Sequence, residues 1–155
     1  EPQPEGFEIF FGTPNLIKTS YRNAVLADAM VNPTNPQHPL RVAAYKNDLL
    51  AQNWTPAQPM LLCGGNGDPT VFFEFNTTTA KNYFTGRGVP DQAVTVLDVD
   101  SFNPTATTDP FYEVKGGFAQ AKAAAGDAAA VLQAYHGTLV PPFCNAAARG
   151  YFAQF

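Results

Sequence analysis

Residues 59–75 read PMLLCGGNGDPTVFFEF, an apolar run followed by three glycines and an aspartate. The segment MLLC (60–63) is short and apolar at every position, which is typical of a parallel strand buried beneath helices. The glycines allow a tight turn after this strand, and Pro69 restricts Asp68 to extended backbone. We expect Asp68 at the carboxyl end of the strand, where open α/β sheets place catalytic and binding groups. The alternative is a surface turn in which Asp68 caps its own backbone.

Strand and helix patterns alternate on either side of this turn. Apolar periodicity, prolines and glycines predict, in chain order, helices over 13–31 and 40–53 with a loop over 32–39, a helix over 76–84, a strand over 93–99, an irregular connection over 101–117, a long helix over 118–135 and a terminal helix over 141–155. A strand, a helix and a second strand form the unit of a parallel α/β sheet. The sequence therefore predicts an α/β protein.

The composition predicts a folded domain and argues against two kinds of partner. The chain has 155 residues, of which 45% are hydrophobic, enough to bury a substantial core. Only 14% of the residues are charged and the net charge is −4, so we expect no nucleic acid and no anionic membrane as an electrostatic partner. We expect no stable membrane anchor either, because prolines, glycines and polar residues interrupt every long apolar stretch. The opening EPQPEG (1–6) lacks the features of a signal peptide, which suggests that the chain begins downstream of a removed or separate segment.

The two cysteines, Cys63 and Cys144, do not belong to any CxxC pair. This arrangement argues against a zinc site and against a thioredoxin-like motif. The two side chains can form one structural disulfide, which would imply an oxidising compartment. The alternative is two buried thiols in a reducing compartment.

The two histidines differ in what they could do. His136 lies in AYHGTLVPPF (134–143), between a predicted helix end and a glycine-containing loop, a setting that suits a general base. The alternative is a structural histidine that interacts with the dipole of a helix C-terminus. His38 lies in a proline-rich loop without an acid at useful spacing, so we expect it to be simply exposed.

An aspartate followed much later by a histidine is the order in which α/β-hydrolases supply acid and base, after a serine earlier in the chain. From NDLLAQNW (47–54) through PMLLCGGNGDPTV (59–71) to AYHGTLVPPFC (134–144), the sequence resembles the C-terminal part of secreted bacterial lipases and esterases of the α/β-hydrolase fold. The resemblance implies helical cap or lid material over 1–53. It implies the last parallel strands of a hydrolase sheet, with flanking helices, over 54–155.

The resemblance also implies a role for each candidate residue. Asp68 follows the seventh strand of the family's sheet and is the acid, 93–99 is the eighth strand, and His136 is the catalytic histidine. Asp68 would orient His136 and stabilise its imidazolium, while His136 moves a proton between a serine and the leaving alcohol. The substrate is a carboxylic ester, whose acyl chain the sequence does not define, and the reaction class needs neither cofactor nor metal.

One feature of the family is missing, because the chain contains no GxSxG. Its only serines, Ser20 and Ser101, lack the flanking glycines that a nucleophile turn requires. We therefore expect the upstream portion of the same hydrolase to supply the nucleophilic serine and the oxyanion hole. This chain alone should not hydrolyse esters.

Several alternatives accompany this interpretation. Asp98 and Asp100, at the end of the strand 93–99, are competing acids that rank below Asp68. Cys63 could be a nucleophile, but LLCGG lacks the first glycine of a GxCxG variant, and we expect Cys63 to pair with Cys144 in a secreted or periplasmic protein.

A different class of function is a non-catalytic α/β interaction domain in which Asp68 and His136 are structural. The aromatic clusters FEIFFG (7–12) and PFY (110–112) are expected mainly in the core, although the first could line an acyl pocket.

Overall fold

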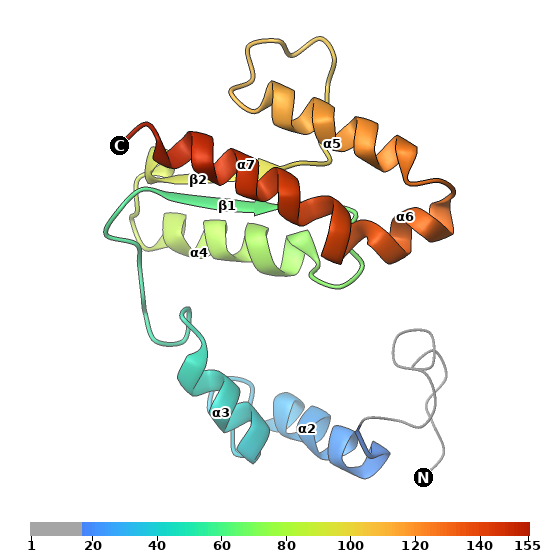
Figure 1. Cartoon of the computed structure of the whole chain (residues 1–155). Coiled ribbons are helices and arrows are strands. Elements are labelled where there is room, and N and C mark those ends of the chain that lie inside the picture. The colour runs from blue at the N-terminus through green and yellow to red at the C-terminus, as the bar shows by residue number, and fades with distance from the viewer. Residues whose placement is uncertain (1–16) are drawn as a thin grey trace. The chain divides into compact units, whose positions relative to one another are not determined.

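The computed structural model describes residues 17–155, and the chain divides into two compact units, one ending at Trp54 and one beginning at Thr55. The aromatic stretch 7–12 lies outside the described residues. The elements, labelled in Figure 1, are α2 (Thr19–Val31), α3 (Pro39–Asn47), β1 (Met60–Gly64), the π-helical turn η1 (Glu74–Thr78), α4 (Thr79–Gly86), the 3₁₀ turn η2 (Asp91–Ala93), β2 (Val94–Asp98), α5 (Tyr112–Ala124), α6 (Ala128–Ala134), the π-helical turn η3 (Tyr135–Leu139) and α7 (Val140–Phe152).

The first unit is built from α2 and α3, which a proline-rich loop connects. Helix α3 begins at Pro39, and the Nδ1 atom of His38 accepts a hydrogen bond of 3.3 Å from the Leu40 amide. The expectation that His38 is simply exposed is therefore wrong, because its side chain is half-buried and caps this helix. The predicted helix over 40–53 is also too long. It ends at Asn47, because Asp48 has extended backbone and Asn53 adopts a left-handed conformation with φ of 57°.

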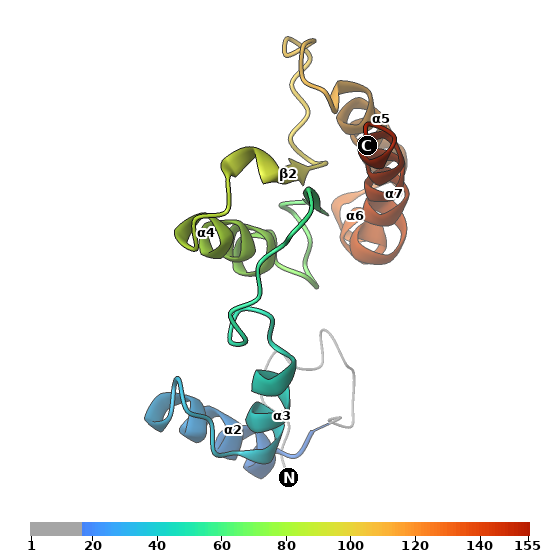
Figure 2. The same cartoon turned by 90° about the vertical axis from the view of Figure 1, so that its left-hand side faces the viewer.

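The second unit contains the sheet. Strands β1 and β2 are parallel, with Met60 opposite Val94 and Gly64 opposite Asp98, and α4 lies between them in the chain. Helix α4 covers one face of the two strands, and α5, α6 and α7 lie on the other face (Figures 1 and 2). This arrangement is a strand, helix and strand unit, so the α/β prediction is confirmed at that level. The prediction of a fully buried β1 is wrong, since all five of its residues are only half-buried: within 17–155 it pairs with β2 alone.

The helices after the sheet differ from the prediction in two ways. The alanine-rich segment does not form one long helix over 118–135. Helix α5 already begins at Tyr112, inside the predicted irregular connection, and Gly126, with φ of 110°, separates it from α6. The carboxylate of Asp127 then caps α6 by accepting a hydrogen bond of 2.9 Å from the Ala130 amide. His136 does not stand before a loop, because η3 continues directly into α7.

The core of the second unit lies between the sheet and the helices α5 and α7. It consists of Leu97, Val99, Phe118, Tyr135, Leu139, Val140 and Ala147. A disulfide joins Cys63 of β1 to Cys144 of α7, with 5.7 Å between the two Cα atoms, so the predicted disulfide is confirmed. Across the helices of 17–155, none has the length and apolar character needed to cross a bilayer.

Candidate functional site

Asp68 sits on the turn that follows β1. Its own amide donates a hydrogen bond of 3.1 Å to the Gly65 carbonyl, which closes the turn, and the residue is only 6% exposed. The Oδ1 atom of Asp68 accepts hydrogen bonds from the amides of Thr70, at 2.8 Å, and Val71, at 2.9 Å. One oxygen of the carboxylate therefore caps its own turn, as the surface-turn alternative expects. The other oxygen, Oδ2, is left for a different partner.

That partner is His136. The Nδ1 atom of His136 lies 2.8 Å from Asp68 Oδ2, although the two residues are 68 positions apart in the chain. The imidazole is 48% exposed, whereas the Asp68 side chain is 5% exposed. Because Oδ2 of an ionised carboxylate can only accept, the hydrogen-bond network assigns the proton to Nδ1 and leaves Nε2 as an acceptor. The arrangement is a buried acid that orients a solvent-accessible base.

The environment of Asp68 keeps its carboxylate ionised. Burial is the largest influence and acts to raise the pKa of Asp68, but the hydrogen bonds from the Val71 amide, His136 and the Thr70 amide together outweigh it. The pKa of Asp68 is therefore lowered below its ordinary value. A carboxylate that is charged at neutral pH is what the stabilisation of an imidazolium requires.

The competing acids at the end of β2 have other partners. Asp98 Oδ1 accepts hydrogen bonds from the amides of Asn66, at 3.1 Å, and Asp100, at 2.9 Å. The Asp100 carboxylate is bound by Lys122 Nζ at 2.6 Å and 2.8 Å and accepts the Tyr135 hydroxyl at 2.5 Å. These two acids hold backbone and side chains around the turn, and the carboxylate at His136 is that of Asp68.

Sequence reasoning missed Tyr135. Its side chain is 2% exposed, and its hydroxyl accepts a hydrogen bond of 3.1 Å from the Gly67 amide. A Cβ atom at Gly65 would lie 2.6 Å from the Tyr135 hydroxyl, and one at Gly67 would lie 3.0 Å from it. The turn before Asp68 therefore contains glycine because the phenol packs directly against its backbone. The signal in the sequence was an aromatic residue beside the predicted catalytic histidine.

Ser101 and Cys63, two of the remaining candidate nucleophiles, are held by partners other than the imidazole. Ser101 Oγ donates a hydrogen bond of 2.7 Å to the Asp98 carbonyl, and Ser20 belongs to α2 of the first unit. Cys63 is bonded to Cys144, so its sulfur is not available for a cysteine-hydrolase mechanism. In the described part of the chain, no group of three or more His, Cys, Asp or Glu side chains is placed to hold a metal ion.

Apolar side chains are exposed directly after Asp68. Val71, Phe72 and Phe75 are 44%, 54% and 75% exposed, and the rings of Phe72 and Phe75 meet edge to face with centroids 6.0 Å apart. The predicted aromatic stretch 110–112 lies elsewhere. Phe111 packs against the core and helps to line a cavity of about 160 Å³ beside Tyr151. The Tyr151 hydroxyl bonds to the Met60 carbonyl at the start of β1, so this cavity belongs to the end of the strand opposite Asp68.

No family model matches this chain, and no curated protein and no solved structure matches it either. The geometry of the described residues is therefore what bears on function. That geometry provides an ionised buried carboxylate, an oriented imidazole and an acceptor nitrogen on an accessible ring. Such a pair can take a proton from a nucleophile and return it to a leaving group.

Proposed function

We propose that this chain supplies the acid and the histidine of a serine carboxylic-ester hydrolase, a lipase or esterase, whose nucleophilic serine lies outside the chain. The observation that carries the proposal is the hydrogen bond of 2.8 Å between the buried Asp68 and the accessible His136. Its place in the fold supports it as well, since Asp68 follows the carboxyl end of a parallel strand.

The chemistry follows from the direction of the hydrogen bonds. His136 Nε2 removes the proton of a serine hydroxyl as that oxygen attacks the ester carbonyl, and the resulting imidazolium is stabilised by Asp68. His136 then gives the proton to the leaving alcohol. The acyl-enzyme is hydrolysed by water through the same two proton transfers. No cofactor takes part in these steps.

The nucleophile is expected from another segment because the chain contains no GxSxG, and the hydroxyl of Ser101 donates its hydrogen bond to the Asp98 carbonyl. The upstream portion of the same hydrolase would supply the serine and the oxyanion-hole amides. The disulfide between Cys63 and Cys144 supports a secreted or periplasmic location, since such bonds persist in oxidising compartments. In this proposal, the helical first unit is part of a cap or lid.

The first test is the effect of His136→Ala in the complete hydrolase, measured as hydrolysis of a p-nitrophenyl ester. We expect kcat to fall by about 10⁶-fold, the order of loss when the histidine of a triad is removed. His38→Ala is the matched control. It should retain activity, because His38, the other histidine of this chain, caps α3. Unchanged activity in a folded His136→Ala protein would overturn the proposal and favour a non-catalytic interaction domain.

The second test locates the nucleophile. A fluorophosphonate probe reacts with activated serines, so it should label the upstream segment of the complete hydrolase and leave residues 1–155 unlabelled. The chain by itself should hydrolyse no ester. Labelling of Ser20 or Ser101 would show that the chain carries its own nucleophile, which contradicts the proposed division of the triad.

A further inference from the structure

Tyr135 and His136 are neighbours on η3, and both meet the turn that carries Asp68. The Gly67 amide donates to the Tyr135 hydroxyl at 3.1 Å, and Asp68 Oδ2 meets His136 Nδ1 at 2.8 Å. The two contacts therefore join consecutive residues of the turn to consecutive residues of η3. A shift of the turn at Gly67 would move the carboxylate that follows it relative to the imidazole.

The orientation of the Tyr135 hydroxyl is fixed by a third segment. Its single proton is donated to Asp100 Oδ2 at 2.5 Å, which leaves the oxygen to accept the Gly67 amide. Lys122 Nζ binds both oxygens of Asp100, at 2.6 Å and 2.8 Å, and so favours the carboxylate form that accepts this proton. The bonds run in one consistent direction from Lys122 through Asp100 and Tyr135 to Gly67.

Burial keeps this arrangement in place. Tyr135 is 2% exposed, and its ring packs edge to face on Phe118 with centroids 5.7 Å apart. Burial, followed by the hydrogen bond to Asp100, raises the pKa of Tyr135 well above its ordinary value, so the hydroxyl keeps its proton throughout the neutral range. Gly65 and Gly67 leave no side chain between the turn and the phenol.

We propose that Tyr135 is a positioning residue for the acid–base pair: its hydroxyl, oriented by Asp100, holds the Gly67 amide and thereby sets where the Asp68 carboxylate meets His136. The assignment of a catalytic purpose to this contact rests on the proposed function. The contact itself can be tested on the chain without any enzymatic assay.

The test is NMR of the full chain labelled with ¹⁵N-histidine, which follows the downfield proton on Nδ1 of His136. His38 does not interfere, because its Nδ1 accepts the Leu40 amide in the neutral form and carries no such proton. Asp68→Asn should shift or remove the His136 resonance. Tyr135→Phe should retain it, with exchange against water roughly fivefold faster, as expected when one hydrogen bond that holds the turn is lost.

Tyr151→Phe is the matched control. Tyr151 is 7% exposed, and its hydroxyl also bonds to backbone, the Met60 carbonyl at 3.3 Å, but at the start of β1. This variant removes one tyrosine hydroxyl from the same unit and should leave the His136 proton unchanged. Equal exchange rates in Tyr135→Phe and Tyr151→Phe would overturn the positioning role. If Tyr135→Phe does not fold, Asp100→Asn serves in its place and should accelerate exchange in the same way, and a wild-type rate in that variant would also overturn the role.

Activity separates this inference from the proposed function. In the complete hydrolase, Tyr135→Phe should lower kcat for the p-nitrophenyl ester with little change in KM, and Tyr151→Phe should change neither. An active His136→Ala protein would overturn the proposed function, while the NMR comparison would still decide whether Tyr135 holds the turn. An inactive His136→Ala protein together with a fully active Tyr135→Phe protein would overturn the positioning role alone.

Discussion

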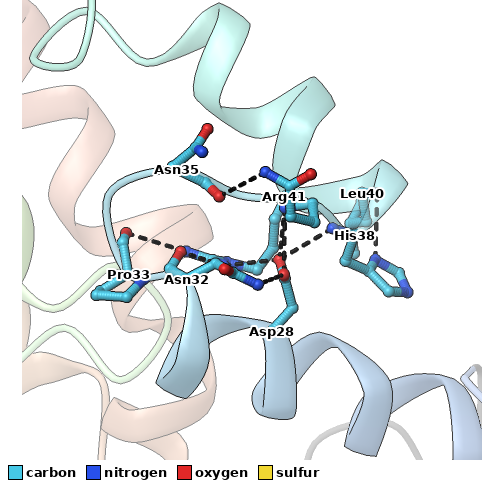
Figure 3. A network of polar contacts seen from close by, with 8 residues as sticks. Asp28, Asn32, Pro33, Asn35, His38, Leu40 and Arg41 are labelled. Atoms are coloured by element: carbon cyan, nitrogen blue, oxygen red, sulfur yellow. Dashed lines mark hydrogen bonds and ion pairs between the residues drawn. The ribbon is translucent and has the colours of Figure 1, made fainter.

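The two units of the chain are stabilised internally by different kinds of interaction. Across 17–54, no residue is fully buried, and a single carboxylate organises the loop between α2 and α3. Figure 3 shows this network, in which Asp28 accepts hydrogen bonds from the Asn32 side chain, the amides of Gln37 and His38, and Arg41 Nη1 at 2.7 Å. The second unit instead buries an apolar cluster around Phe118 and carries the disulfide.

The second unit is better suited than the first to hold a fixed catalytic geometry. A buried cluster and a covalent link tolerate little displacement, so the segments that they join keep their relative positions. The second unit places Asp68 and His136 on two such segments. Asp68 follows the strand that carries Cys63, and His136 precedes the helix that carries Cys144. A surface network around one charge depends on pH and has no apolar core behind it. Under the proposed function, such a network suits a cap better than it suits a catalytic centre.

The largest effect that this comparison predicts is the loss of the disulfide. The double variant Cys63→Ser/Cys144→Ser should lower the free energy of unfolding of the second unit by about 4 kcal/mol, because the bond closes a loop of 81 residues. Native-state hydrogen exchange reports the two units separately, and the amides of β1 and β2 should exchange faster in the variant. Equal acceleration in α2 and α3 would show that the two units do not unfold independently.

An effect of similar size is expected from a cavity in the core. Phe118 is 0% exposed, so Phe118→Ala should destabilise the second unit by about 3 to 5 kcal/mol. Leu26→Ala is the counterpart in the first unit, where Leu26 is 52% exposed, and it should change the stability of that unit by no more than about 0.5 kcal/mol. The same hydrogen-exchange experiment measures both. A loss in Leu26→Ala as large as that in Phe118→Ala would contradict the contrast between the units.

The strands were predictable because their sequence patterns are local. The apolar run 60–63 and the β-branched run 93–99 correspond to β1 and β2 within about one residue. The break at Gly126 was missed, since alanine on both sides favours a continuous helix and the positive φ of one glycine has no signature of its own. The capping role of His38 was missed for a similar reason, because histidine is not among the usual N-cap residues.

The candidate site was predictable only in part. Asp68 and His136 could be named because the glycine-rich turn after a strand is a local pattern and the resemblance to α/β-hydrolases implies an acid there and a histidine later in the chain. Tyr135 could not be placed, because its contact with Gly67 joins residues 68 positions apart and one sequence shows no such pairing. The reason for the glycines became visible only with the phenol packed against them.

A smaller effect concerns the contact between the glycine turn and the Tyr135 phenol. Gly65→Ala would place a Cβ atom 2.6 Å from the hydroxyl of a buried tyrosine, so we expect a loss of about 1 to 3 kcal/mol in the second unit. Gly86→Ala is the control, because nothing lies within 4 Å of the added Cβ at the end of α4. An alanine in that helix should stabilise the unit by about 0.5 to 1 kcal/mol. Urea unfolding of the two variants should therefore shift in opposite directions, and a stabilised Gly65→Ala protein would be inconsistent with a turn packed tightly on Tyr135.

The smallest effect, and the one that separates the units most cleanly, is their response to acid. The His38 amide, followed by the Asn32 and Arg41 side chains and the Gln37 amide, lowers the pKa of Asp28 far below its ordinary value against the opposing effect of burial. A carboxylate whose pKa is lower in the folded state stabilises that state fully above its unfolded pKa of about 3.9, and this stabilisation is lost as the pH falls through the folded pKa. NMR of the α2 and α3 amides should show lower protection factors in Asp28→Asn at pH 6, and these protection factors should change little as the pH is lowered.

The pKa of Asp68 is lowered too, so acid also weakens the second unit. The two units differ in the interactions that remain once these carboxylates are protonated. Without the Asp28 charge, α2 and α3 have no buried cluster to hold the loop, whereas β1 and α7 keep the disulfide and the core when Asp68 is neutral. As the pH falls below about 4, the ordinary pKa of an aspartate, the amides of α2 and α3 should therefore lose protection before those of β1 and β2. The reverse order would mean that the carboxylate at the candidate site contributes more to its unit than the core does, and that Asp68 is primarily structural.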